Sequence, residues 1–149
     1  MPEALASLSL PELEELYRGP LGPAPAGDHV GTFLGFLDSA GGRDPRYRAL
    51  STVMFRWPRF GVDFHRQLWW FGARRIALGR FRAARGPSQW RDGEVIQVRY
   101  EPSRLPRAVK ARMYDEVKPL PDGRVLGIGG IVDERGALDL FFFGLSPAV

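Results

Sequence analysis

The last quarter of the chain limits the fold most, because two consecutive segments, 124–132 and 137–145, are apolar on both strand faces. They flank the turn-like sequence 133–136 and so predict a closing β-hairpin. A hairpin that is apolar on both sides needs cover on both sides. In a small all-β domain one face then borders a packed or ligand-filled interior, and a helix or a partner subunit covers the other. This pattern predicts a barrel with a pocket and leaves a homodimer open.

Length and composition narrow the class further. The 149 residues fit one domain, 1–149, which is long enough to bury a core. Without cysteine there are no disulfides and no thiolate ligands, and His29 and His65 are the only imidazoles, so we expect no metal and no other cofactor. The N-terminus lacks the pattern of a signal peptide and no apolar run is long enough to span a bilayer. We therefore expect a cytoplasmic protein without a transmembrane segment.

The N-terminal region predicts one short helix. Ser9 and Glu12 have the spacing of a capping box, and Leu8 and Leu13 fit a hydrophobic staple. The helix should cover residues 9–18, because Gly19 and Pro20 end it. The segment 19–28 is dense in proline, glycine and alanine and predicts an extended connector.

The remaining segments predict mostly strands. A first strand is expected over 30–37, and a second over 94–101 with Ile96, Val98 and Tyr100 on one face. The same alternation predicts a strand over 107–113. Between 46 and 85 the periodicity is mixed, and we expect a strand near 50–56, irregular or helical structure near 64–72 and a strand near 74–83. The fold class is thus mostly β, a single antiparallel β-barrel with a short N-terminal helix.

Two groups of residues resemble a known family. Residues 31–35, Gly-Thr-Phe-Leu-Gly, are similar to the G-x-W-x-G signature of lipocalin-like bacterial domains, with Phe33 at the tryptophan position. Tyr114, Asp115, Pro119, Gly127 and the aromatic segment 141–143 resemble the C-terminal half of the same proteins. The resemblance implies a calycin-type antiparallel barrel, from a group largely without assigned activity.

The candidate site residues follow from this barrel. Side chains expected to line a ligand pocket are Phe33, Trp69, Trp70, Tyr100, Met113 and Phe142. Since side chains alternate across a strand, either Phe142 or its two phenylalanine neighbours would face inward, and core packing accounts for such a triplet more often than a ligand cavity does. The candidates for proton transfer are His65, Tyr114 and Asp115, of which the last two should lie on opposite faces of a regular strand. Gly127, Gly129 and Gly130 sit inside a strand with no following helix, so we expect no phosphate loop. We expect these glycines to accommodate barrel curvature or a bulky neighbour such as Trp69 or Trp70.

A basic segment leaves a second function class open. Residues 55–91 contain nine arginines and one acidic residue, a net charge of +8 in a chain whose total is +4. All four tryptophans lie in the same segment, a composition that could bind single-stranded nucleic acid or an anionic surface. Barrel strands with aromatic residues inside and arginines outside would give the same composition, and we favour this interpretation. Some of the arginines could then surround the pocket mouth and favour an anionic head group.

The sequence therefore favours binding of a small apolar or amphiphilic, possibly anionic, molecule in a barrel cavity. An isomerase, cyclase or dehydratase that acts on such a molecule is the enzymatic alternative, and whether the chain is an enzyme stays open. Binding of nucleic acid or an anionic surface through residues 55–91 is the third hypothesis. We expect no specific nucleic-acid partner.

Overall fold

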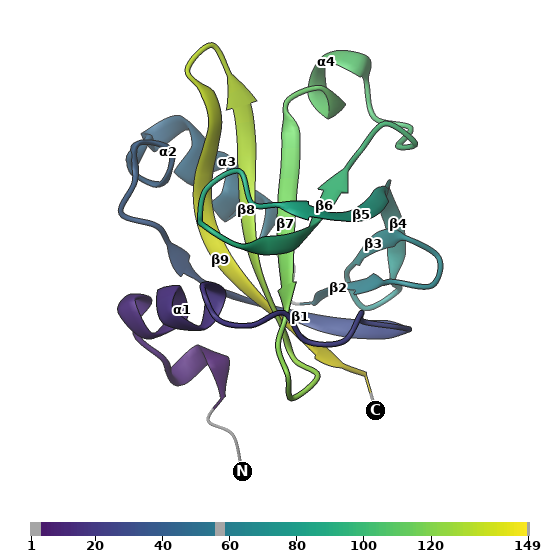
Figure 1. Ribbon diagram of the computed structural model, residues 1–149. Coiled ribbons are helices and arrows are strands. Elements are labelled where there is room, and N and C mark those ends of the chain that lie inside the picture. Colours follow the sequence, from purple (N-terminus) through teal and green to yellow (C-terminus); the bar gives the residue numbers. More distant parts are fainter. Residues whose placement is uncertain (1–3, 56–58, 149) are drawn as a thin grey trace.

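The computed structural model describes residues 4–55 and 59–148, and Figure 1 shows a strongly curved antiparallel sheet with short helices around it. Arg56 and Trp57, part of the basic segment, lie outside the described residues. The helices are α1 (Leu10–Tyr17), α2 (Ala40–Arg43), α3 (Pro45–Met54) and α4 (Arg107–Lys110), and the 3-10 turn η1 (Leu5–Ser7) precedes them. The strands are β1 (Asp28–Phe36), β2 (Phe60–Asp63), β3 (Leu68–Phe71), β4 (Ile76–Arg80), β5 (Arg82–Pro87), β6 (Glu94–Arg99), β7 (Met113–Pro119), β8 (Val125–Asp133) and β9 (Gly136–Pro147).

The order of the strands in the sheet follows their order in the chain. The sheet reads β4-β3-β2-β1-β9-β8-β7-β6-β5, and β1 pairs with β9, which joins the first strand to the last. The two outermost strands, β4 and β5, are consecutive in the chain and meet at Phe81. The sheet is therefore a meander curled into a nearly closed nine-stranded barrel, as the mostly β fold class predicted.

One end of the barrel carries most of the helices. The α2–α3 segment, the 72–75 turn, the 100–112 segment with α4, and the 134–135 turn each connect a strand that reaches this end to one that leaves it. We call it the α3 end. In Figure 1 the β8–β9 hairpin and α4 stand together at the top of the view. The 64–67, 88–93 and 120–124 connections lie at the opposite end.

The closing hairpin has the two-sided cover that its sequence predicted. Phe141, Phe143 and Leu145 of β9 belong to the core inside the barrel. Phe142 points to the outer face, where its ring lies 6.0 Å from that of Tyr17 in α1. The N-terminal helix, and not a partner subunit, therefore provides the outer cover.

Local signals explain the helix that covers this outer face. The Ser9 side chain accepts a hydrogen bond from the Glu12 amide, and the Glu12 carboxylate accepts one from the Ser9 amide at 2.7 Å. This is the predicted capping box, and it starts α1 with Leu13 and Tyr17 buried against the barrel. The extended connector follows, held by a hydrogen bond from the Gly22 amide to the Pro119 carbonyl of β7.

Two of the predicted strands were wrong. Residues 50–56 fall largely in helix α3, which Asp44 caps and Pro45 opens, so helix-start chemistry outweighs the β-branched and aromatic residues that follow. Residues 107–110 form one helical turn, and β7 begins only at Met113. Residues 64–67 form a turn as expected, but 68–71 form strand β3, in which both Trp69 and Trp70 are buried on opposite faces. Burial on both faces removes the alternation that identifies a strand.

Candidate functional site

The inside of the barrel is filled with aromatic and aliphatic side chains, but not evenly. Near the end opposite α3, Val62, Val117, Val125 and Leu145 are at most 1% exposed. Most of the side chains that pack on this core but are only partly buried lie toward the α3 end: Phe33, Phe36, Tyr47, Phe55, Phe71, Met113 and Ile131. Phe64 and Ala83 are partly buried elsewhere. The aromatic lining therefore meets solvent at the α3 end.

The Phe55 ring, at the end of α3, covers part of this aromatic lining. The ring lies 5.1 Å from that of Phe33, 4.9 Å from that of Phe60 and 5.0 Å from that of Phe141. Helix α3 itself has one buried residue, Ser51, so little apolar burial holds it against the barrel. Few buried contacts mean low local stability, and α3 is the element whose displacement would expose the lining at least cost.

A polar group stands among the inner side chains. Asp115 of β7 points inward, where one carboxylate oxygen accepts a hydrogen bond from the Tyr100 hydroxyl and the other from the Gly130 amide at 3.2 Å. Trp69 of β3 lies near Tyr100, because Gly79 sits between the two rings. A Cβ added to Gly79 would lie 3.6 Å from an atom of each ring. The Trp69 indole nitrogen is buried near the Tyr100 hydroxyl but forms no hydrogen bond of good geometry with the described residues. We call Trp69, Tyr100 and Asp115 the inner polar triad.

The surroundings of the triad shift the proton affinity of both hydrogen-bonded partners. Removal from water raises the pKa of Asp115 from 3.8 to about 6, and the hydrogen bond from Tyr100 opposes this rise. Burial and the charge of Asp115 raise the pKa of Tyr100, and the Trp69 indole opposes it. Asp115 is thus a carboxyl group that can change its protonation state near neutral pH, with a neutral phenol next to it.

The raised pKa of Asp115 predicts a pH dependence of stability. Because the folded pKa of about 6 exceeds the ordinary 3.8, the folded state binds more protons than the unfolded state between these values. Stability from this group is therefore present at low pH and is lost as pH rises through 6. We expect Asp115→Asn to remove a contribution on the order of 2 kcal/mol across this window, measured as unfolding free energy in urea at several pH values. Parallel pH profiles of the variant and the parent protein would contradict the assignment.

The other predicted site residues divide between the two faces of the sheet. Phe33 and Met113 pack on the inner core with the triad residues Trp69 and Tyr100. Trp70 faces outward, donates to Asp28 at 2.8 Å and lies under the Arg75 guanidinium. Phe142 is covered by α1, so neither of these two lines the interior.

The proton-transfer candidates also separate. Tyr114 lies on the outer face, opposite to Asp115, as their neighbouring positions in a strand predicted, and donates to Glu116 at 2.8 Å. His65 is exposed in the turn after β2. Of the three candidates, the structure places only Asp115 among the inner apolar side chains.

A buried charged group on the outer face was missed by sequence reasoning. The Glu116 carboxylate is 0% exposed and accepts four hydrogen bonds: from Tyr17 and Tyr114 at 2.8 Å, Ser88 at 2.6 Å and the Gln89 amide at 2.5 Å. Burial raises the pKa of both tyrosines, so they remain neutral donors. This Glu116 network connects α1, β7 and the 88–93 loop and stabilises their packing. Its partners lie far apart in sequence, and only an acidic residue inside an otherwise apolar strand hints at it.

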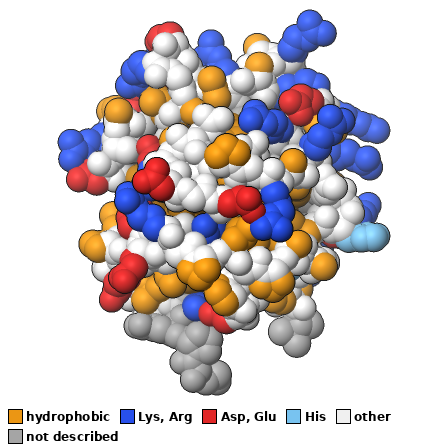
Figure 2. Space-filling view, in the orientation of Figure 1, with side chains coloured by type: hydrophobic (Ala, Val, Ile, Leu, Met, Phe, Trp, Pro, Cys, Tyr) orange, Lys and Arg blue, Asp and Glu red, His pale blue; other side chains and the backbone are white. Residues whose placement is uncertain are grey.

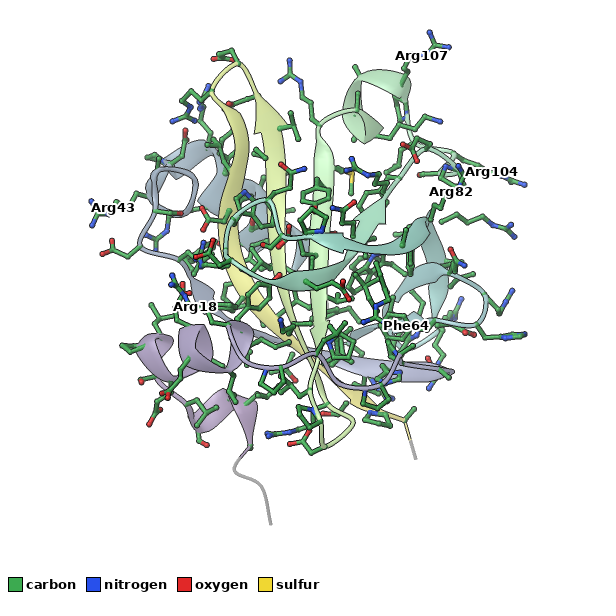
Figure 3. All side chains as sticks on the ribbon, in the orientation of Figure 1. Arg18, Arg43, Phe64, Arg82, Arg104 and Arg107 are labelled. Carbon is green, nitrogen blue, oxygen red and sulfur yellow. The ribbon has the colours of Figure 1, made fainter. Side chains whose placement is uncertain are left out.

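The arginines of the basic segment do not form one stripe. Arg75 pairs with Asp28, Arg85 with Glu94, and Arg91 with Glu14 and Asp139. A second group lines a shallow hollow where β4 passes into β5: Arg66, Arg80 and Arg82, with His65, Gln67, Phe81 and Pro102. Figure 2 shows Lys and Arg side chains gathered at the upper right of the visible face, where Figure 3 labels Arg82 and Arg104.

The tryptophans of this segment are poorly placed to bind bases. Trp69 and Trp70 are 8% and 3% exposed. Trp90 packs on the Tyr114 ring at 5.2 Å and donates to the Ala137 carbonyl. Stacking on bases needs an open ring face, so this arrangement favours barrel packing over single-strand recognition.

Comparison with family models, curated proteins and solved structures finds no match to this chain. Within residues 4–55 and 59–148, no three His, Asp or Glu side chains are grouped as metal ligands. None of the helices in the same ranges is long and apolar enough to cross a bilayer.

Proposed function

We propose that the barrel binds a small apolar or amphiphilic molecule through the aromatic lining at the α3 end. The buried Trp69 indole nitrogen carries this proposal, because within the described residues its contact with the Tyr100 hydroxyl falls short of a well-formed hydrogen bond. A ligand oxygen that accepts from it would recover part of the roughly 1–3 kcal/mol that an unsatisfied buried donor costs. The resemblance to lipocalin-like bacterial domains belongs to the same proposal and supports a barrel interior as the site.

The triad also selects the polar group of the ligand. A carbonyl or hydroxyl oxygen can accept from Trp69 and face the neutral Tyr100, whereas a carboxylate would meet the charge of Asp115 at neutral pH. The ligand class that fits is an apolar molecule with one uncharged oxygen. Since side chains fill the interior, binding requires Phe55 to leave its three ring contacts, which the weak burial of α3 permits.

A second candidate function rests on the pKa of Asp115. A carboxyl group with a pKa of about 6 is suited to general acid–base catalysis, and it lies inside the same lining. The corresponding enzyme would be an isomerase, cyclase or dehydratase with Asp115 as acid or base. It would lose turnover in Asp115→Asn while keeping ligand affinity.

The test compares two probes of equal carbon number, methyl nonyl ketone and undecanoate, by tryptophan emission. We expect saturable binding of the ketone, and Trp69→Phe should weaken it about tenfold, the worth of one hydrogen bond. Undecanoate should bind better at pH 5 than at pH 7, because Asp115 is then protonated.

Trp70→Phe is the matched control, because Trp70 lies on the outer face. It should leave the affinity for the ketone unchanged. Absence of saturable binding by either probe, with native mass spectrometry of the purified protein showing no retained small molecule, would contradict the proposal.

A further inference from the structure

The exposed apolar side chains of the described residues gather at the α3 end. The large ones are Leu50 (60% exposed), Val53 (62%), Met54 (38%), Ile76 (51%), Leu78 (46%), Val109 (45%) and Val132 (36%). All but Leu78 lie in α3, α4, the start of β4 or the end of β8, which are the parts that form this end. Leu78 lies two residues further along β4. We call the other six the apolar rim.

Contacts between these parts make the rim continuous. On one side Phe55, next to Met54, touches Phe60, which packs on Phe71, and Phe71 pairs with Ile76. On the other side Tyr47 of α3 donates to Asp133, the neighbour of Val132.

The rim also continues to α4. The Val132 amide donates to the Arg112 carbonyl just after α4, the helix that carries Val109. The four segments that carry the six side chains are therefore linked to one another around the α3 end.

Unpaired arginines lie on the same segments as the apolar rim. Five arginines of the same segments form no ion pair within the described part of the chain: Arg48, Arg74, Arg104, Arg107 and Arg112. Arg107 and Arg104 extend from the region of α4 into solvent in Figure 3. Fewer acidic side chains there are free of an ion pair. Asp44 and Asp133 are paired with arginines, and Glu101 and Glu134 remain.

We propose that the α3 end docks on an anionic lipid surface. Apolar tips on four separate segments, with arginines between them, match the boundary between head groups and acyl chains, where apolar side chains insert and cations meet lipid charge. Leu50, Val53 and Met54 lie at helical spacing on α3, so this helix would enter the membrane boundary first.

The experiment is sedimentation of the protein with vesicles. We expect binding to vesicles of phosphatidylcholine mixed with phosphatidylglycerol, weaker binding to phosphatidylcholine alone, and loss of the difference at high salt. The double variant Leu50→Gln, Val53→Gln should reduce partitioning about tenfold or more, with unchanged unfolding because both side chains are exposed. Arg107→Gln with Arg112→Gln should reduce binding to the charged vesicles only.

Two controls keep the result specific. Leu78→Gln replaces a similarly exposed leucine outside the rim and should leave partitioning unchanged. Trp69→Phe should also leave it unchanged, so the docking surface and the interior ligand site can fail independently. No binding to charged vesicles, equal loss with Leu78→Gln, or a dimer that the double variant dissociates would overturn the proposal.

Discussion

Replacement of Glu116 by alanine is expected to destabilise the protein by about 3–5 kcal/mol, because buried donors left without an acceptor cost roughly 1–3 kcal/mol each. The carboxylate is fully buried and accepts from two tyrosines, one serine and one backbone amide. The two buried tyrosine hydroxyls would lose their acceptor without gaining water, whereas Ser88 and the exposed Gln89 border solvent. Urea unfolding at neutral pH measures the loss.

An exposed glutamate, Glu94, is the control that distinguishes the effect of burial from the effect of removing a carboxylate. Glu94 pairs with Arg85, but their side chains are 51% and 67% exposed. Glu94→Ala should therefore cost no more than about 1 kcal/mol. Similar losses for the two variants, or a loss below 1 kcal/mol for Glu116→Ala, would show that the network does not hold α1 on the barrel.

Gly127→Ala is expected to cost about 1–3 kcal/mol through overpacking inside the barrel. A Cβ at this position would lie 2.1 Å from the tip of the Phe143 ring, which packs at 5.5 Å on Trp69. The ring is 2% exposed and has little room to move. Gly79→Ala is the control, because its Cβ would meet no atom closer than 3.6 Å. Equal stability of the two variants in urea would contradict this packing.

The glycines of β8 illustrate what sequence can predict and what it leaves open. That residues 127–130 make room for bulky neighbours follows from glycine in an apolar strand. The neighbours themselves are Phe143, Phe141 and Trp90, and not the expected Trp69 or Trp70. Cross-strand register decides this, and register depends on loop geometry that composition does not specify.

The same limit applies to the candidate site. Strand alternation correctly separates Tyr114 from Asp115 and groups Tyr100 with the inner residues of β6. The hydrogen bond between Tyr100 and Asp115 depends on how the 100–112 segment returns to the sheet, and its alternating residues form one helical turn where a strand was expected. Helix α3 was predictable from Asp44 and Pro45, but the β-forming residues after them concealed it.

The most direct test of an interior binding site is the indole N–H resonance of Trp69, identified by its absence in Trp69→Phe. Within residues 4–55 and 59–148 this nitrogen is buried without a well-formed hydrogen bond. If the barrel binds an apolar molecule through an uncharged oxygen, titration with methyl nonyl ketone moves this resonance downfield to saturation, as expected for a new hydrogen bond. A Trp69 resonance that stays in place while the ketone saturates its binding would contradict the inner polar triad as the site.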